Sequence, residues 1–167
     1  MVNPIRLIRH LLTPGWLVHL KFNHAAMQQI TAAIEATEAT HAGEIRFAVE
    51  AALPLGELLK NCEATDRAVE LFSRLRIWDT EHNNGVLIYL LLADRNVEIV
   101  ADRDIYRKVD AREWEEIALA MEQLCREGDF VAAVTTGVHA VSRLLGRHFP
   151  AQGEAVNELP DEPVIVA

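Results

Sequence analysis

The sequence predicts an α/β fold, a three-layer α/β/α sandwich in which about four helices cover a small mixed β-sheet. Two observations lead to this class. Helix-like and strand-like segments alternate along the chain, and the eight residues from Val86 to Ala93 are all apolar. A strand without a polar face needs cover on both sides of its sheet, and amphipathic helices supply that cover.

The first predicted helix follows Asn23, a residue type that commonly caps helix N-termini, and its apolar face carries Met27, Ile30 and Ile34. The segment 41–43 ends with a glycine and stops this helix. Residues 44–49 then alternate polar and apolar side chains with the period of two that is typical of a strand.

The remaining elements follow in the same way. A second helix begins at Thr65 and ends near Trp78, and the apolar strand 86–92 comes after it. A short polar turn separates that strand from a second one at residues 97–101, which indicates a hairpin. Asp110 opens a third helix, and Asp129 opens a fourth that reaches to about Pro150.

We expect three regions: a basic, apolar N-terminal segment (1–22), one domain (23–150) and an acidic, flexible tail (151–167), in which Val164–Val166 could attach the end. In the N-terminal segment, Ile5, Ile8 and Leu12 have the spacing to dock a helix onto the domain. The alternative is that this basic amphipathic piece contacts an anionic membrane. We favour docking, because residues 14–15 (Pro-Gly) prevent one long interfacial helix.

Composition excludes several classes of protein. The 167-residue chain has a formal net charge of −9, without the clustered basic footprint that nucleic acids require, so we expect no nucleic-acid partner. Only two cysteines occur, Cys62 and Cys125, which indicates no disulfide framework and a reducing compartment. No segment matches a signal peptide or a transmembrane helix. We therefore expect a cytoplasmic protein, with a peripheral membrane location as the alternative.

The predicted hairpin determines where two acidic segments lie. In an antiparallel pair, the start of the first strand lies beside the end of the second. Loop 79–84 therefore comes next to residues 102–104, while Asp94 lies at the opposite sheet end. The residues gathered at the first end are Asp79, Glu81, Asn83, Asn84, Asp102 and Asp104, with His82, Arg103 and Arg107 nearby.

Carboxylate and amide oxygens on loops suit hard cations such as Ca²⁺ and Mg²⁺. Carboxylates near one another also raise each other's proton affinity until a cation or an arginine neutralises them. We therefore predict a Ca²⁺ or Mg²⁺ site made by the six Asp, Glu and Asn residues just named, although the spacing is not that of an EF-hand. The alternative is a solvated turn whose acids pair with Arg103 and Arg107.

No complete catalytic signature is present. None of the seven histidines belongs to an HExxH pair, which gives a zinc hydrolase little support. The GxSxG, Walker A and GxGxxG motifs are also absent. These absences disfavour a nucleophile elbow, an NTPase and a dinucleotide fold, and we expect no organic cofactor.

Several short motifs are spread between residues 23 and 149. They are Gly43-Glu44-Ile45, Leu71-Phe72, Trp78, Asn83 to Ile88, Asp94-Arg95 with Val97 to Ile99, and Gly128-Asp129-Phe130 with Ala133 and Gly137-Val138. Together they resemble the TPM domain family, named for a plant thylakoid lumen protein, a photosystem repair protein and a nematode receptor regulator. The run Asn84-Gly85-Val86-Leu87 is the most specific part.

The resemblance implies an α/β/α sandwich with an acidic cleft at the sheet end selected above. Members of the family have been proposed to be acid phosphatases or to bind divalent cations such as calcium. The chain departs from many members in two ways. Residues 101–106 stand where a glycine-rich stretch is common, and a signal peptide or membrane anchor is not seen.

Two functions follow. The first is a noncatalytic divalent-cation-binding or protein-interaction module, which works with an unidentified protein partner and, in one version, at a membrane. The alternative is a metal-assisted phosphatase for phosphomonoesters, in which the predicted acids hold the metal while Arg103 or Arg107 binds phosphate. We favour the first, because no nucleophile or general base is convincingly positioned.

Overall fold

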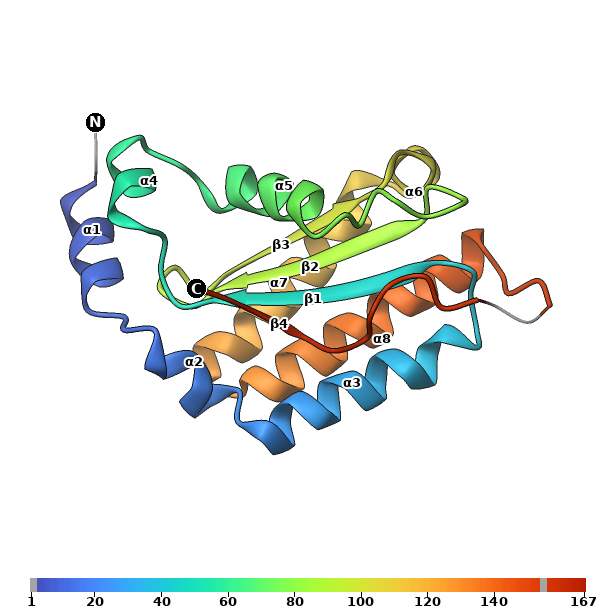
Figure 1. The fold of residues 1–167 in the computed structure, drawn as a ribbon, viewed down its shortest axis with the longest axis horizontal. Coiled ribbons are helices and arrows are strands. Elements are labelled where there is room, and N and C mark those ends of the chain that lie inside the picture. Colours follow the sequence, from blue (N-terminus) through green and yellow to red (C-terminus); the bar gives the residue numbers. More distant parts are fainter. Residues whose placement is uncertain (1–2, 154–155) are drawn as a thin grey trace.

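A computed structural model describes residues 3–153 and 156–167 and shows a four-stranded mixed sheet (Figure 1). The strands are β1 (Glu44–Glu50), β2 (Gly85–Leu91), β3 (Asn96–Ala101) and β4 (Val164–Val166). Their order across the sheet is β3-β2-β1-β4, in which β1 runs parallel to both β2 and β4, and β3 is antiparallel to β2. The predicted mixed sheet is confirmed.

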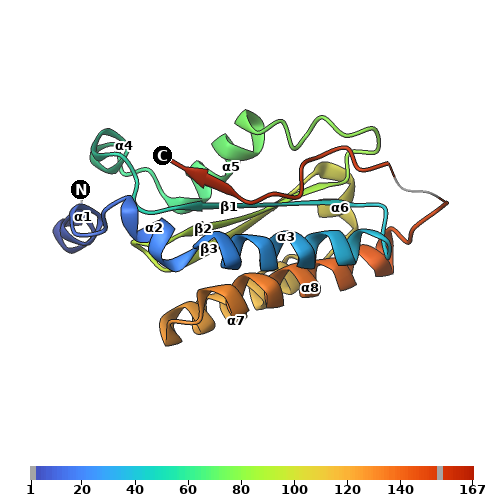
Figure 2. The ribbon, with the colours of Figure 1, turned by 60° about the horizontal axis from the view of Figure 1, so that its bottom comes forward.

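Four long helices cover the two faces of the sheet, as predicted (Figures 1 and 2). One face packs against α3 (His24–Glu38), α7 (Ala111–Glu127) and α8 (Phe130–His148), and the opposite face packs against α5 (Ala64–Arg74). Side chains of β1 and β2 alternate between these layers, so that Phe47 and Ile88 join the first core while Ala48 and Tyr89 join the second. The three-layer α/β/α class is therefore confirmed.

Local capping sets the helix bounds. The Asn23 side chain accepts a hydrogen bond from the Ala26 backbone N–H (3.0 Å) at the start of α3, and Asp129 does the same for Ala132 (3.1 Å) in α8. Gly128 ends α7 in the left-handed conformation with φ 91°, which glycine adopts without strain. Asn23 and Asp129 are the residues that the sequence selected as helix starts.

The sheet register brings three strand ends together. Val86 pairs with Ala101 across the hairpin, which confirms the predicted antiparallel arrangement. Strands β1 and β2 are joined through α5 and run parallel, so that Glu44 pairs with Gly85. The starts of β1 and β2 and the end of β3 consequently share one end of the sheet, and Asp94 lies at the other end.

The N-terminal segment forms α1 (Pro4–Leu11) and α2 (Trp16–Lys21). The expectation that Ile5, Ile8 and Leu12 dock this segment is wrong, because these side chains are 74%, 56% and 76% exposed. Basic side chains of α1 make the contacts instead: Arg6 and Arg9 donate to the Asp94 carboxylate at 2.9 and 2.5 Å. Charge-assisted hydrogen bonds to one partly buried carboxylate outweigh a stripe of aliphatic side chains here.

The acidic tail, expected to be flexible, is attached along much of its described length. Strand β4 pairs with residues 48–50 of β1, as the apolar run Val164–Val166 allowed. The Arg46 side chain donates to the carbonyl oxygens of Pro160 and Glu162, the second at 3.0 Å. Two further short helices not foreseen from sequence, α4 (Leu55–Leu59) and α6 (Arg103–Lys108), lie in the connections.

Candidate functional site

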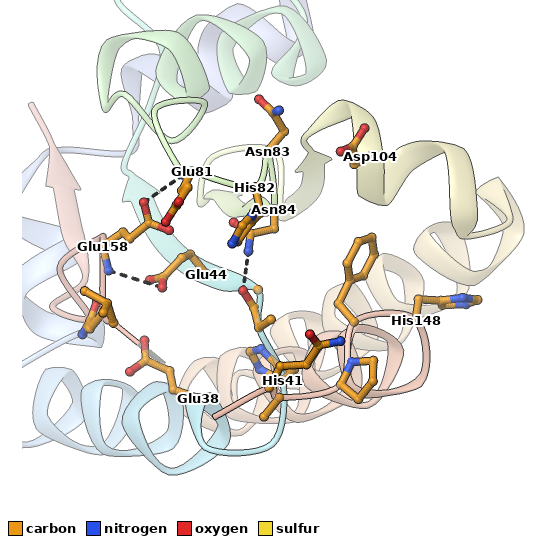
Figure 3. A pocket seen from close by; sticks show the side chains of 18 of the residues that line it. Glu38, His41, Glu44, Glu81, His82, Asn83, Asn84, Asp104, His148 and Glu158 are labelled. Carbon is orange, nitrogen blue, oxygen red and sulfur yellow. Dashed lines mark hydrogen bonds between the residues drawn. The ribbon is translucent and has the colours of Figure 1, made fainter. Parts of the chain in front are cut away.

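A wide, open cavity of about 1280 Å³ lies where β1 and β2 begin (Figure 3). Its walls come from the C-terminal end of α3, the start of β1, the loop 81–84, α6, the end of α8 and the tail. The parallel pairing of β1 with β2 and the hairpin place these segments together. This is the sheet end that the hairpin argument selected.

Four of the predicted metal ligands line the cavity: Glu81, Asn83, Asn84 and Asp104. Asn84 is the buried member, with 2% of its surface exposed. Its backbone N–H donates to the Thr80 hydroxyl (3.2 Å), and its side-chain NH₂ donates to the Ala42 carbonyl. The side-chain oxygen Oδ1 has no hydrogen-bond partner among the described residues. Asn84 therefore lines the cavity with a fixed side chain whose acceptor oxygen is buried and unused within the described part of the chain.

The other predicted residues lie elsewhere. The Asp79 carboxylate pairs with Arg76 at 2.5 Å on the surface and does not line the cavity. Asp102 is buried and caps α6, accepting a hydrogen bond from the Arg103 backbone N–H at 2.7 Å. Arg103 and Arg107 are exposed on α6 and are not among the lining residues. The hairpin thus brings the two loops together, but only some of their side chains converge.

No preassembled ligand set is present in residues 3–153 and 156–167. No three His, Cys, Asp or Glu side chains in these ranges come close enough together to hold a metal ion. Glu81 and Asp104 are exposed and lie on a loop and on the first turn of α6. Their side chains can therefore rotate, in contrast to that of Asn84.

Sequence reasoning missed the acidic residues on the opposite wall. Glu44, at the start of β1, is buried and accepts hydrogen bonds from the backbone N–H groups of Glu158 and Leu159, both at 3.3 Å. Burial raises the pKa of Glu44, and the two hydrogen bonds oppose that shift. A signal for this residue exists: two strands joined through a helix run parallel, so the residue that opens β1 had to lie beside the one that opens β2.

Glu38, near the end of α3, carries the largest electrostatic perturbation of the cavity. Burial, together with the neighbouring Asp161 carboxyl, raises the pKa of Glu38 to about 8. At neutral pH this carboxyl therefore holds a proton. Buried His41 has the reverse shift, because burial lowers the pKa of its ring and leaves it neutral. Counted over the described lining residues, the cavity wall has more carboxylates than basic side chains.

The TPM domain family model matches residues 22–144. The chain belongs to the TPM domain family. Among solved structures, this TPM domain is similar to the NMR structure of the BA42 protein from the psychrophilic bacterium Bizionia argentinensis. The two share 26% sequence identity and a TM-score of 0.75, over 85% of this chain and 93% of BA42. No curated protein sequence matches the chain.

Within the described residues, no helix has the length and apolar character needed to cross a bilayer.

Proposed function

We propose that this TPM domain is a noncatalytic module that binds a divalent cation in the cavity at the start of β1 and β2. The main supporting observation is Asn84 Oδ1, a buried amide oxygen without a hydrogen-bond partner among the described residues, in a wall that is rich in carboxylates. Among residues 3–153 and 156–167, the lining carboxylates are Glu35, Glu38, Glu44, Glu81, Asp104 and Glu158. One lysine, Lys108, lines the same cavity, and its ammonium group lies 4.3 Å from the centre of the Phe149 ring.

These oxygens are the ligand types that Ca²⁺ and Mg²⁺ prefer. The raised pKa of Glu38 is in keeping with the proposal: burial is its main cause, and the neighbouring carboxyls of Asp161, Glu44 and Glu35 add to it. A cation in the cavity supplies the missing positive charge.

The arrangement favours Ca²⁺ over Mg²⁺. Asn84 Oδ1 is fixed, whereas the exposed side chains of Glu81 and Asp104 must rotate toward it, so a bound ion would draw the loop 81–84 and the start of α6 together. Ca²⁺ accepts six to eight oxygens in irregular geometry, while Mg²⁺ demands a near-octahedral set and releases its water reluctantly. We expect binding to be accompanied by ordering of the loop 81–84.

The test is a calcium and magnesium titration of the metal-free protein, followed by calorimetry and melting temperature. Native-state binding adds about 2.7 kcal/mol of stability when the ion is at a hundred times its Kd, and the melting temperature rises accordingly. We expect Glu81→Gln and Asp104→Asn each to weaken binding about tenfold.

The matched control is Asp79→Asn, because Asp79 belongs to the same acidic segment but pairs with Arg76 outside the cavity. It should bind calcium like the wild type. Asp102→Asn is a poor test, since Asp102 caps α6 and its loss acts on the fold. An unchanged melting temperature at millimolar calcium would refute cation binding, and equal losses in Asp79→Asn and Asp104→Asn would refute the location.

The size of the cavity favours a second candidate, binding of a basic segment of a protein partner. A volume of about 1280 Å³ is far larger than one ion and exceeds that of most small-molecule sites. Lysine or arginine side chains of such a segment would meet the same carboxylates. Chemical shift changes with a lysine-rich peptide, measured with and without calcium, distinguish the two candidates.

The phosphatase alternative has less support from the geometry. A phosphoryl group needs cationic donors beside the metal. Arg103 and Arg107, the two residues predicted for that role, are exposed on α6 and do not line the cavity. Hydrolysis of p-nitrophenyl phosphate that disappears in Asp104→Asn would support this alternative instead.

A further inference from the structure

A set of large apolar side chains is exposed along the two N-terminal helices and the turn between them. This surface, here named the N-terminal apolar surface, consists of Ile5, Ile8, Leu11, Leu12, Trp16 and Leu20, which are between 56% and 76% exposed. Successive members are separated by three or four residues, except for the adjacent pair Leu11 and Leu12. Two leucines of α4, Leu55 and Leu59, are 50% and 57% exposed at the same end of the molecule (Figure 1). Apolar patches of this kind mark interaction surfaces in soluble domains.

The outward direction of this surface is fixed by how α1 is attached. Arg6 donates to the Asp94 carboxylate (2.9 Å) and to the Cys62 carbonyl (2.9 Å). His10 is buried, and its Nδ1 accepts a hydrogen bond from the Leu53 backbone N–H (3.0 Å). Because the polar side of α1 is held against the domain, its apolar side must face solvent.

A second cavity, of about 450 Å³, borders the same two helices. Four cationic side chains line it: Arg9 of α1, Lys21 of α2, Arg95 of the β2–β3 turn and Arg126 of α7. The two acids among the lining residues that the structure describes are Asp94 and Glu127. Asp94 pairs with Arg6 and with Arg9, which is one of the four cations, and Arg126 pairs with Glu122 at 3.8 Å. The cavity is therefore a cationic feature in a protein whose formal net charge is −9.

We propose that the N-terminal apolar surface docks onto an anionic lipid bilayer, with lipid phosphate groups at the cationic cavity. Amphipathic helices bind the bilayer interface by burying an apolar face while nearby cations meet anionic headgroups. Trp16, which is 64% exposed, belongs to a residue type that is enriched at the membrane–water interface. An anionic bilayer is favoured over a second copy of this protein, because two copies facing each other would bring the same cationic side chains together, and these would repel.

The proposed orientation also separates the two cavities. Asp94 and Arg95 lie at the opposite end of β2 from Gly85, so the acidic cavity faces away from the lipid. The docking proposal rests on different residues from the cation proposal, and either can fail without the other.

The test is co-sedimentation of the full chain with vesicles of phosphatidylcholine alone or containing about one third phosphatidylglycerol. We expect binding to the anionic vesicles that weakens with added salt. Leu12→Glu and Trp16→Glu should each lower the vesicle-bound fraction about tenfold or more, because a charge replaces a buried apolar contact. The matched control is Leu119→Glu on α7, since Leu119 is 57% exposed but lies outside the surface, and it should bind like the wild type.

Two further measurements test the parts of the proposal. Arg126→Glu should weaken binding to anionic vesicles, whereas Arg143→Glu, exposed on α8 and absent from the cationic cavity, should not. The tryptophan emission should shift to the blue on vesicle binding. Trp16→Phe should remove this shift, and Trp78→Phe, which replaces another exposed tryptophan, should keep it.

Three outcomes overturn the proposal. Wild type that stays in the supernatant with anionic vesicles is one, and equal binding by Leu12→Glu and the wild type is another. In the third, the wild type forms a dimer in analytical ultracentrifugation and does not bind vesicles, while Leu12→Glu is a monomer. This result would show that the surface binds a second copy of the protein.

Discussion

Gly85, which opens β2 directly after the cavity loop, allows the backbone to approach more closely than any side chain would permit. A Cβ atom at this position would lie 2.3 Å from the Ile77 carbonyl oxygen and 2.7 Å from its Cγ2. Contacts of Cβ atoms below 3.0 Å essentially do not occur, so Gly85→Ala must separate the segments by at least 0.7 Å. The obstructing atom is backbone, and Ile77 is fully buried, so neither side can yield cheaply.

Overpacking of this kind lowers the free energy of unfolding by about 1–3 kcal/mol. We expect a loss of about 3 kcal/mol for Gly85→Ala, because no flexible side chain can move aside. For a domain of this size, each kcal/mol lowers the melting temperature by about 2–4 °C, which gives a fall of about 6–12 °C. The same displacement should move the loop 81–84 and weaken calcium binding in the cavity.

Thermal unfolding followed by circular dichroism measures this effect, with Gly56→Ala as the matched control. Gly56 lies in helix α4, where a Cβ atom meets nothing within 4 Å, so this change should be neutral or stabilising by up to about 1 kcal/mol. If Gly85→Ala melts within about 2 °C of the wild type, the reasoning from close backbone approach is refuted.

Further predictions concern ionisable groups. Arg67 makes two hydrogen bonds of 2.9 and 2.8 Å to buried Glu50, so Arg67→Met should cost about 3–5 kcal/mol in urea unfolding by stranding that carboxylate. As a control, Arg74→Met removes only an exposed salt bridge of 3.8 Å with Glu70 and should lower the free energy of unfolding by less than about 1 kcal/mol. Equal losses of stability in the two variants would contradict the expectation for Arg67. The raised pKa of Glu38 means that the folded state binds a proton between its unfolded pKa and about 8, so its contribution to stability falls as pH rises through that range. Glu38→Gln should flatten this dependence in melts at pH 5, 6.5 and 8, and an unchanged slope would assign the proton elsewhere.

The fold could be predicted because its main elements are long and locally specified. Asn23 and Asp129 cap helices in the structure as their residue types indicate, and uniform apolarity marks β2 as a central strand. The prediction of how the N-terminal segment docks was wrong for a specific reason. Its aliphatic stripe resembles any core-facing helix, and sequence cannot show that the neighbouring arginines find Asp94, which lies 88 residues from Arg6.

The candidate site could be located from the sequence but not assembled. Hairpin geometry places loops correctly, whereas the direction of each side chain depends on its nearest partner. Asp79 turns to Arg76, three residues away, and Asp102 turns to the helix that it caps. That helix, α6, has only six residues and is too short for an apolar period to reveal. Glu158 reaches the cavity through the tail, which carries no pattern of its own.

Strand β4 has a consequence for the colloidal behaviour of the protein. The outer side of β1 would otherwise present unpaired N–H and C=O groups, and exposed strand edges template association between chains. Three residues of β4 pair along Ala48–Glu50, while the other edge strand, β3, is contacted by α5 and α7. The acidic tail therefore shields an edge as well as lining a cavity. Removal of residues 160–167 should increase light scattering on heating before it changes the far-ultraviolet spectrum.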